Sequence, residues 1–373
     1  MRELNLFGAG DLRWVERPEP GVGSPRGAVV RPFVVSRCDG DTLPIHRRVS
    51  RVMQAGLLDP AVGHICGPVP FAGPFAIGHE CIAEVVEVGT EVRQVRVGDR
   101  VVVPWAVSCG ECASCVRGLT SKCVTARTTP EGVRTLAAYG FGPSSGPFGG
   151  MVSDLLAVPF AEAMLVPVPP GVDPVRVAAA SDNLSDGWRA VAPLLAERPH
   201  SRVLVLGGGG KSIGLYAAGI AAALGAAQVD YADWSAGRLQ IAQALGAAPL
   251  ERDRRSAAGL GEYDVVVEAS SSTSGVRAAI RSTAPGGTCT AVGYYVGRNT
   301  GIPLFHMYAT DITLRLGVSH PRGVLPELLE WVGTSGFAAE RVTTEVADFD
   351  DAATAYAHCT TKLVLQREPL GVA

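Results

Sequence analysis

RVLVLGGGGKSIGLYAAG, residues 202–219, decides the fold of the second half of the chain. The short apolar run predicts a strand, the glycines that follow predict a tight turn, and the alanine-rich continuation predicts a helix. In such a unit the backbone N–H groups of the turn and the helix N-terminus bind a pyrophosphate. The stretch therefore predicts a dinucleotide-binding βαβ unit.

The glycines of this turn are the candidate cofactor-binding residues. They are Gly207, Gly208, Gly209 and Gly214. Their spacing is irregular, because a G-x-G-x-x-G turn that begins at the first glycine would end at Ser212. The turn therefore carries about two residues more than the usual pattern, with Lys211 among them.

A carboxylate follows the turn at the distance expected for ribose binding. The next strand-like run ends at Asp233, 19 residues beyond Gly214. A carboxylate there accepts hydrogen bonds from the adenosine ribose and repels a 2′-phosphate, which favours NAD(H) over NADP(H). Arg238 is a further cofactor-binding candidate, since an arginine in this region can accommodate that phosphate. The alternative for Asp233 is an N-cap on the next helix.

The rest of the chain separates into two patterns. Around the turn, short apolar runs alternate with Ala- and Leu-rich stretches, as in QVDYAD (228–233) and SAGRLQIAQALG (235–246), which predicts βαβ units on a parallel sheet. The first half is rich in Val, Gly and Pro, and runs such as AVVRPFVV (28–35) and CIAEVVEVG (81–89) predict an antiparallel β domain. With 373 residues we expect two domains in an α/β protein.

Composition excludes several classes of partner. Charged residues are 18% of the chain and the net charge is -3, so no basic field favours a nucleic acid or an anionic membrane. The apolar residues are interrupted by 45 Gly and 26 Pro, and no run reaches the roughly 20 residues of a membrane span. The N-terminus has acidic residues where a signal peptide needs an apolar core. We expect a cytoplasmic protein with a small-molecule substrate.

Four of the nine cysteines lie within SCGECASCVRGLTSKC, residues 108–123. Their pattern is Cys-x2-Cys-x2-Cys-x7-Cys, and they are Cys109, Cys112, Cys115 and Cys123. Four thiolates at this spacing predict a closed tetrahedral, structural zinc site in a reducing compartment. An iron–sulfur cluster or buried free thiols are the alternatives. A nucleic-acid-binding zinc finger is disfavoured, because only Arg117 and Lys122 are basic in this stretch.

A second set of metal ligands is scattered along the sequence. Cys38 lies in SRCDGDT (36–42), and His79 and Glu80 stand at the head of a valine-rich strand. A thiolate, an imidazole and a later carboxylate form a mixed shell that can keep one position open for a substrate. A lone histidine is more often a core residue, and the spacing does not show that these residues meet.

Together these motifs resemble the zinc-dependent medium-chain alcohol dehydrogenase family. The resemblance rests on RCDGD (37–41), GHE (78–80) with VGTEVRQVRVGDRVV (88–102), the four-cysteine segment, GGMVSDLLAVP (149–159) and the glycine-rich βαβ unit. It implies a GroES-like β-barrel catalytic domain over 1–170, with a structural-zinc lobe at about 108–124, and a Rossmann domain over 171–320. Residues 321–373 would return to the catalytic domain, and the active site would lie in the cleft between the two domains.

The resemblance also assigns ligands to the catalytic zinc. Cys38 and His79 match zinc ligands, and Glu80 matches an acidic residue that ligates the zinc or serves as its alternate ligand. Asp182 takes the place that many members give to Cys, as in some formaldehyde-dehydrogenase-like members. The alternative for Asp182 is a helix N-cap.

The implied activity is hydride transfer between NAD(H) and an alcohol or carbonyl substrate, with two zinc ions per chain. This chain departs from the family at Gly40, where a Ser or Thr usually starts a proton relay, and at Leu43, where some members keep a His. Either the proton leaves by another route, or the enzyme reduces an iminium or activated alkene, as related reductases of secondary metabolism do. A non-enzymatic NAD(H)-binding protein is a further alternative.

The resemblance also indicates a substrate pocket and an assembly. The pocket candidates are Leu43, Trp105, Trp188 and Tyr294, whose apolar and aromatic side chains suggest a hydrophobic alcohol, aldehyde or ketone. Family members commonly pair their Rossmann sheets edge to edge, and DITLRLGV (311–318) is a candidate edge for a homodimer or homotetramer.

Overall fold

The computed structural model describes residues 1–46, 73–128, 135–140, 142, 145–295 and 300–370. The chain divides into two compact units. The first unit is Met1–Asp182 with His320–Thr334 and Thr344–Ala373, and the second is Asn183–Ser319 with Ser335–Thr343.

These boundaries differ from the expected ones, at 170/171 and 320/321, for local reasons. The segment before Asn183 stays with the first unit because Ser181 Oγ bonds both the N–H and the carbonyl of Cys81. Residues 335–343 belong to the second unit, where Phe337 lies against Gly219 and Arg341 Nη1 donates to the Ala244 carbonyl at 2.6 Å.

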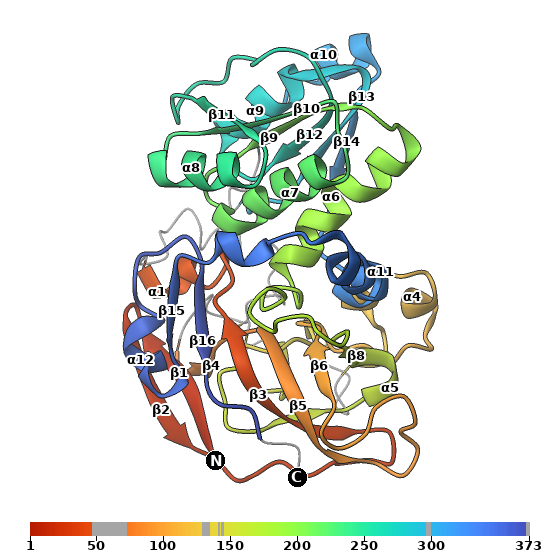
Figure 1. Cartoon of the computed structure of the whole chain (residues 1–373), viewed down its shortest axis with the longest axis vertical. Helices are drawn as coiled ribbons and strands as arrows, with labels where there is room; N and C mark the ends of the chain where they lie inside the picture. Colours follow the sequence, from red (N-terminus) through yellow and green to blue (C-terminus); the bar gives the residue numbers. More distant parts are fainter. Residues whose placement is uncertain (47–72, 129–134, 141, 143–144, 296–299, 371–373) are drawn as a thin grey trace. The chain divides into compact units, whose positions relative to one another are not determined.

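The first unit is built on a seven-stranded sheet (Figure 1). Six of its strands have the order β15-β16-β3-β5-β6-β8, and the seventh, β7, pairs with the first three residues of β3. Among the described strand pairs of this sheet, β15/β16 is parallel and the others are antiparallel. A three-stranded antiparallel sheet has the order β2-β1-β4. The strands are β1 (Arg2–Gly8), β2 (Asp11–Glu16), β3 (Ala28–Ser36), β4 (Phe75–Ala76), β5 (Glu80–Val88), β6 (Arg100–Val103), β7 (Leu156–Val158), β8 (Val166–Pro167), β15 (Glu345–Asp348) and β16 (Leu363–Gln366).

One core lies beneath both sheets of this unit. Alternate residues of β5 and β6, among them Cys81 and Val101, share a buried cluster with Leu4 of β1. Alternation with a period of two is the pattern expected for strands with one face in the core. The one long helix described in this unit is α11 (Pro321–Ser335, whose last residue falls in the second unit). The other described helices here are short: α1 (Thr42–His46), α4 (Ala113–Val116), η1 (Thr120–Lys122), α5 (Ala161–Met164), η4 (Phe349–Asp351) and α12 (Ala352–Ala355).

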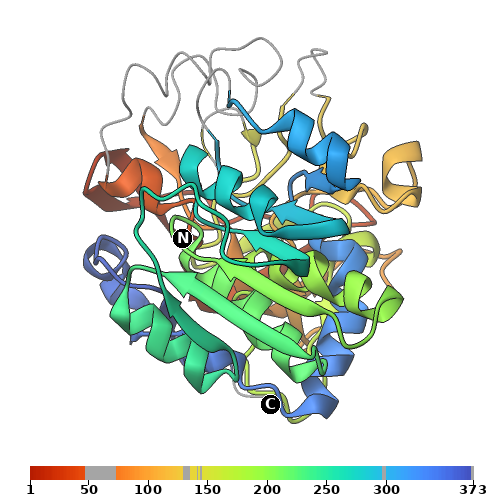
Figure 2. The same ribbon diagram turned by 90° about the horizontal axis from the view of Figure 1, so that it is seen from above.

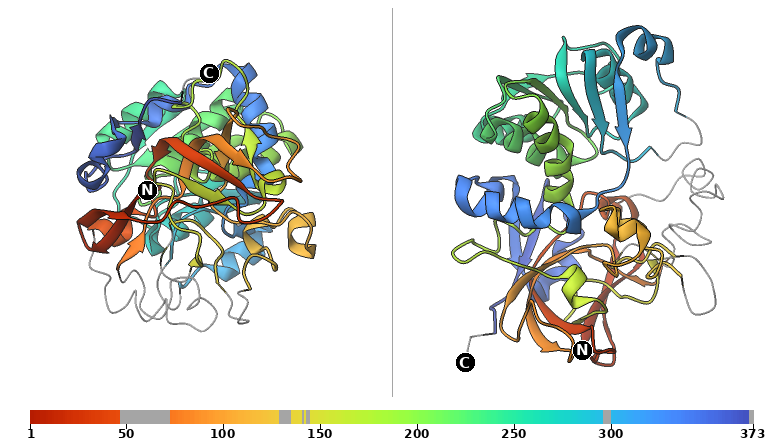
Figure 3. Two further views of the ribbon diagram at one scale, coloured as in Figure 1. Left: turned by 90° about the horizontal axis from the view of Figure 1, so that it is seen from below. Right: turned by 90° about the vertical axis from the view of Figure 1, so that its right-hand side faces the viewer.

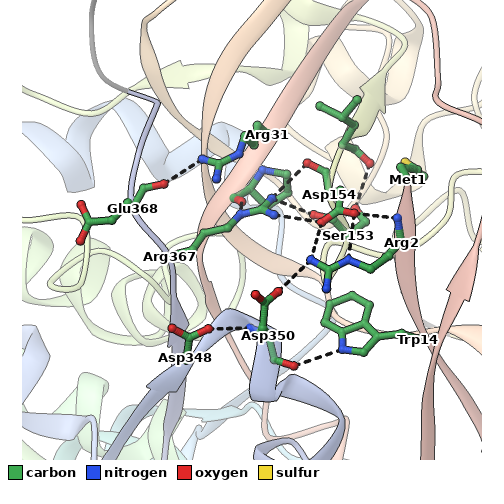
Figure 4. Close-up of polar contacts among 12 residues, drawn as sticks. Met1, Arg2, Trp14, Arg31, Ser153, Asp154, Asp348, Asp350, Arg367 and Glu368 are labelled. Atoms are coloured by element: carbon green, nitrogen blue, oxygen red, sulfur yellow. Dashed lines mark hydrogen bonds and ion pairs between the residues drawn. The ribbon is translucent and has the colours of Figure 1, made fainter.

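A polar network ties the two ends of the chain together within the first unit (Figure 4). Arg2 Nη2 donates to Asp154 at 3.1 Å and to Asp350 at 2.7 Å. Arg367 Nη1 donates to the same Asp154 oxygen at 3.1 Å, and Trp14 Nε1 donates to the Asp350 carbonyl. Single surface ion pairs stabilise little, but a network joins segments that are far apart in sequence.

The second unit carries a parallel six-stranded sheet with the order β11-β10-β9-β12-β13-β14 (Figure 2). Its order reverses at β9/β12, the point where open α/β sheets bind ligands. The strands are β9 (Arg202–Leu206), β10 (Gln228–Asp233), β11 (Ala248–Glu251), β12 (Tyr263–Glu268), β13 (Thr283–Ala291) and β14 (Thr313–Leu316).

Helices cover both faces of this sheet. In the right-hand view of Figure 3, α7 and α8 lie on one face and α9 on the other. The helices are α6 (Asn183–Glu197), α7 (Lys211–Ala223), α8 (Ala236–Ala244), α9 (Thr273–Arg281), α10 (Leu304–Thr310) and the turn η3 (Ala339–Val342). Among the residues that the structure describes, no helix in either unit has the length and apolar character of a bilayer span.

A carboxylate is buried at the end of β12. Ser270 donates to Glu268 Oε1 from both its N–H, at 2.9 Å, and its hydroxyl. In the described part of the chain Glu268 Oε2 has no hydrogen-bond partner. Burial raises the pKa of Glu268 from its ordinary 4.5 to about 7, although Ser270 and Arg252 oppose the shift.

Two glycines approach each other beside the start of β5. Gly78 has φ +93° and Gly140 has φ +58°, and a Cβ on Gly140 would lie 2.0 Å from the Gly78 carbonyl oxygen. Only glycine tolerates both the left-handed backbone and this contact. The contact fixes the backbone directly before His79.

We expect Gly140→Ala to lower the free energy of unfolding by about 1–3 kcal/mol more than Gly98→Ala does, because the new methyl group meets backbone. Gly98 is the matched control: it also has a left-handed φ, +90°, but nothing lies within 4 Å of its added Cβ. Chemical denaturation of both variants measures the difference, and equal losses would show that the contact with Gly78 carries no cost.

We expect Glu268→Gln to change how stability depends on pH. Because the pKa is raised in the folded state, the wild type is most stable while Glu268 is protonated, and it loses about 3 kcal/mol as the pH rises from 4.5 to about 7. The glutamine variant lacks this loss, so its stability relative to the wild type should increase over that window. Denaturation at a series of pH values tests this; a constant difference between the two proteins would contradict it.

Candidate metal centres and nucleotide-binding turn

Three potential metal ligands meet in the first unit. Cys38 follows β3 by two residues, His79 directly precedes β5, and Asp182 is the last residue before α6. One ligand atom from each lies within 4.8 Å of the others. We call these residues the triad.

The atoms of the triad are close enough to share one cation. Cys38 Sγ lies 3.2 Å from Asp182 Oδ2, and His79 Nε2 lies 3.6 Å from the same oxygen. The Gly40 N–H donates to Cys38 Sγ at 3.3 Å, which favours the thiolate. Cys38 and His79 are buried, whereas 13% of the Asp182 side chain is exposed. One thiolate, one imidazole and one carboxylate are a zinc ligand set that leaves a fourth position for a substrate.

The electrostatics of the triad favour a cation. Burial raises the pKa of the Cys38 thiol. Burial acts to lower the pKa of His79, but the charges of Asp41 and Cys38 and hydrogen bonding to Asp182 and Asp41 outweigh it and raise that pKa well above its ordinary value. The surroundings of the His79 ring therefore carry a negative potential, which stabilises a proton or a metal ion at this point.

Glu80 lies outside the triad. Its Oε2 accepts hydrogen bonds from Ser36 Oγ and from Lys362 Nζ, each at 2.5 Å, and all three side chains are buried. Burial raises the pKa of Glu80 to about 7, against the opposing effect of the Lys362 ammonium. In this structure the carboxylate is thus held by a lysine from the C-terminal segment.

Two residues near the triad, Asp41 and Tyr356, are not among the site residues predicted from the sequence. Asp41 Oδ1 lies 3.4 Å from His79 Nδ1, and Tyr356 donates to Asp41 Oδ2 at 2.9 Å. Asp41 is the second Asp of RCDGD, and that motif could have indicated it, since a carboxylate often supports a metal-ligating histidine. The contact with Tyr356 has no local signal.

The four cysteines of the 108–123 segment also meet, with ligand atoms within 4.8 Å of one another. They are Cys109, Cys112, Cys115 and Cys123. Backbone N–H groups point at their sulfurs: Val124 N lies 3.4 Å from Cys112 Sγ, and Ala126 N lies 3.3 Å from Cys123 Sγ. These donors stabilise thiolates in a closed four-sulfur shell, which suits a structural zinc.

Hydrogen bonding separates the pKa values of these thiols. Backbone N–H groups at Cys115 and Val124 outweigh burial and lower the pKa of Cys112 to about 6. Burial and the neighbouring thiols raise the pKa of Cys115, and burial raises that of Cys123. Thiols that raise one another's pKa in this way titrate as a coupled group and not independently.

The segment is anchored to the rest of the first unit. Arg26 Nη2 donates to Glu111 at 2.7 Å and to the Cys109 carbonyl at 3.3 Å. Gly110 has φ +81°, and a Cβ there would lie 2.8 Å from Ala163 Cβ, so glycine is needed in the first Cys-x2-Cys turn.

The glycine turn of the second unit follows β9 and is closed by close contacts. An added Cβ on Gly207 would lie 2.4 Å from Asp233 Oδ2, and one on Gly208 would lie 2.7 Å from Ser270 Cα. Gly209 donates its N–H to the Ser270 carbonyl at 3.0 Å. Gly214, inside α7, allows the helix to lie near Ala269 at 3.3 Å from its added Cβ. The lack of side chains therefore lets β9, β10 and β12 end side by side beneath the turn.

Asp233 and Arg238 form a buried ion pair at the end of β10. Arg238 donates to both carboxylate oxygens, at 2.6 and 2.7 Å, and Tyr231 donates to Oδ2 at 2.9 Å. The N-cap of α8 is Ser235, so Asp233 is not the cap of that helix. The guanidinium carbons of Arg238 and Arg254 lie 5.4 and 5.5 Å from the centroid of the Trp234 ring.

The pocket candidates differ in their surroundings. In the first unit Trp105 is buried with Leu136 and Ala138, and Leu43 is half-buried. In the second unit Trp188 is buried in α6 and Tyr294 is 46% exposed.

Comparison with solved structures shows the fold. Alcohol dehydrogenase TADH from Thermus sp. ATN1 superposes with a TM-score of 0.80 at 26% identity, and the match covers 98% of this chain and 99% of that chain. Residues 27–170 match the family model of the alcohol dehydrogenase GroES-like domain, and residues 212–334 match that of the zinc-binding dehydrogenases. The predicted combination of a GroES-like and a Rossmann-type domain is confirmed.

Comparison with related sequences shows the family. A "Probable zinc-binding alcohol dehydrogenase" of Mycobacterium tuberculosis is 30% identical over 366 residues, which cover 96% of this chain and 85% of that protein. A glutathione-independent formaldehyde dehydrogenase of Pseudomonas aeruginosa is 32% identical over 274 residues, covering 71% of this chain and 63% of that protein. The chain therefore belongs to the zinc-binding alcohol dehydrogenases of the medium-chain dehydrogenase/reductase superfamily, and it is an oxidoreductase.

Proposed function

We propose that this enzyme transfers a hydride between NAD(H) and an alcohol or carbonyl substrate at a catalytic zinc held by Cys38, His79 and Asp182. The observation that carries the proposal is the meeting of these three ligand atoms within 4.8 Å. Glu80, held by Lys362, is the alternate ligand. The four-cysteine segment would hold a second, structural zinc.

The chemistry follows from this ligand set. A zinc ion at the triad supplies a Lewis acid that lowers the pKa of an alcohol or polarises a carbonyl. In the oxidative direction a hydride leaves the carbinol carbon for the nicotinamide and the hydroxyl proton goes to solvent. The protein binds and orients the two reactants. Apolar alcohols, aldehydes and ketones fit the aromatic residues proposed for the pocket.

NAD(H) is the preferred cofactor in this proposal. The proposal rests on the place of Asp233 at the end of β10, where a carboxylate disfavours a 2′-phosphate. In the structure Asp233 is buried and accepts hydrogen bonds from Tyr231 and Arg238. The glycines Gly207, Gly208, Gly209 and Gly214 allow the close packing of the turn after β9, whose backbone N–H groups, with the N-terminus of α7, would bind the pyrophosphate. The cytoplasm is the proposed compartment, because a cluster of thiolate ligands such as that of Cys109, Cys112, Cys115 and Cys123 suits a reducing environment.

A reductase acting on an iminium or an activated alkene is the second candidate. It is favoured by Gly40 and Leu43, because neither residue offers a side chain that could relay the alcohol proton. His46, exposed at the end of α1, and the buried Asp39 are the nearest replacements in sequence.

We expect the wild type to hold about two zinc ions per chain and Cys38→Ala to hold about one, because the variant loses one ligand of the triad. Elemental analysis measures this.

With NAD, a panel of primary and secondary alcohols should be turned over by the wild type and not by the variant. NADP should be a poorer cofactor in the same assay.

Cys359→Ala is the matched control, since Cys359 is an exposed thiol outside both metal sites. Reduction of imines or enals without any alcohol turnover would reject the dehydrogenase in favour of the reductase. One zinc ion in both the wild type and Cys38→Ala would reject the catalytic zinc altogether.

We also propose that two copies of the chain associate through the β14 edge of the six-stranded sheet. In the sheet as described, β14 is the last strand, and Leu316 on it is 61% exposed. On the preceding helix α10, Phe305 and Tyr308 are each 81% exposed, with ring centroids 6.4 Å apart. An exposed strand edge beside an apolar patch is a typical interface between copies.

We expect the double variant Phe305→Asp/Tyr308→Asp to sediment as a monomer while the wild type sediments as a dimer or tetramer, because charges would be buried in the interface. Val97→Asp is the control, since Val97 is 61% exposed in the first unit. An unchanged sedimentation coefficient in the double variant would place the interface elsewhere.

A further inference from the structure

A buried chain of contacts leads away from the triad on the far side of the His79 ring. Tyr356 donates its hydroxyl to Asp41 Oδ2 at 2.9 Å. The other oxygen of that carboxylate, Oδ1, lies 3.4 Å from His79 Nδ1. His79 and Tyr356 are completely buried and Asp41 is 4% exposed, so water does not compete with these contacts.

The backbone of Tyr356 is itself fixed to the segment that carries Cys38. Arg37, the residue before Cys38, donates from Nη1 to the carbonyls of Tyr356 and His358, each at 2.6 Å. Its Nη2 donates to Thr360 Oγ1 at 2.8 Å. The turn after β3 and the segment after α12 are therefore one hydrogen-bonded assembly, and Tyr356 cannot shift without moving the neighbour of a ligand.

We propose that Tyr356 is a positioning residue for the metal at the triad, acting through Asp41 on His79. This rests on the proposed function, because it requires that the triad bind zinc. With one oxygen held by Tyr356, Asp41 presents the other to Nδ1. It thereby fixes the ring so that Nε2 faces Cys38 and Asp182.

Removing the tyrosine hydroxyl leaves a buried carboxylate oxygen without its donor. A buried acceptor in that state is unfavourable, and the carboxylate relieves the cost by turning or by taking up a proton. Either response weakens the contact between the Asp41 carboxylate and His79 Nδ1. Partners of this kind typically change metal affinity by about 10- to 100-fold when they are removed.

Tyr139 provides a matched control in the same unit. It is also completely buried, and its hydroxyl donates to the Ala157 carbonyl at 2.9 Å. Both tyrosines belong to the same core cluster. Tyr139→Phe therefore removes the same atom and a hydrogen bond of the same length, but one that does not lead to a triad residue.

The experiment measures zinc release to a chromophoric chelator from the full-length proteins loaded with zinc. Release from the triad should be about 10- to 100-fold faster in Tyr356→Phe than in the wild type or Tyr139→Phe. Release from the four-cysteine site should be equal in all three and serves as an internal reference. With cobalt at the triad, the visible d–d spectrum should shift only in Tyr356→Phe, which a loss of core packing alone would not produce.

The outcomes separate the inference from the function on which it rests. Two zinc ions in the wild type with unchanged release and an unchanged cobalt spectrum in Tyr356→Phe would overturn the inference and leave the proposed function standing. Zinc at the four-cysteine site alone would overturn both. Asp41→Asn removes the negative charge that faces His79 Nδ1, so it should reproduce the faster release even if Tyr356→Phe folds poorly.

Discussion

Burial of charge around Cys38, His79 and Asp182 is the constraint on which the first unit depends. A thiol, an imidazole and carboxylates so close together are unfavourable in a core unless a cation or a set of donors compensates them. The compensation comes from every side: the Gly40 N–H on the sulfur, Lys362 on the neighbouring Glu80, and Tyr356 on Asp41. The fold that brings these groups together thus also supplies the donors that offset the unfavourable burial of their charge.

The two candidate metal sites differ in how far apart their ligands lie in the sequence. The four cysteines of the 108–123 segment are local, so their spacing alone predicts that the sulfurs converge. The triad joins residues 38, 79 and 182, and only the resemblance to a family indicated that they belong together. In the structure their ligand atoms do converge. The partners behind them, Lys362 and Tyr356, are 282 and 315 residues from the groups they bind and have no pattern of their own.

The second unit was easier to predict from the sequence, because its strands and helices alternate along one continuous part of the chain. The apolar run, the glycines and Asp233 mark β9, the turn and the end of β10 directly. Two features escaped that reasoning. Arg238 binds both oxygens of Asp233, which the spacing does not indicate, and Glu268 is buried at the end of β12. Both depend on side-chain packing across neighbouring strands, which a linear pattern does not record.

The discontinuity of the first unit has a consequence for synthesis on the ribosome. The second unit is made almost entirely of one continuous stretch, Asn183–Ser319, whereas β16 pairs with β3 only after nearly the whole chain has been translated. Domains generally fold as units as they emerge. The four-cysteine segment can therefore capture metal early, while the triad lacks Tyr356 and Lys362 until the last residues leave the tunnel. A truncation that removes the chain from Tyr356 onward would release a protein with the four-cysteine segment complete and with a triad whose neighbouring carboxylates, Asp41 and Glu80, lack their donors.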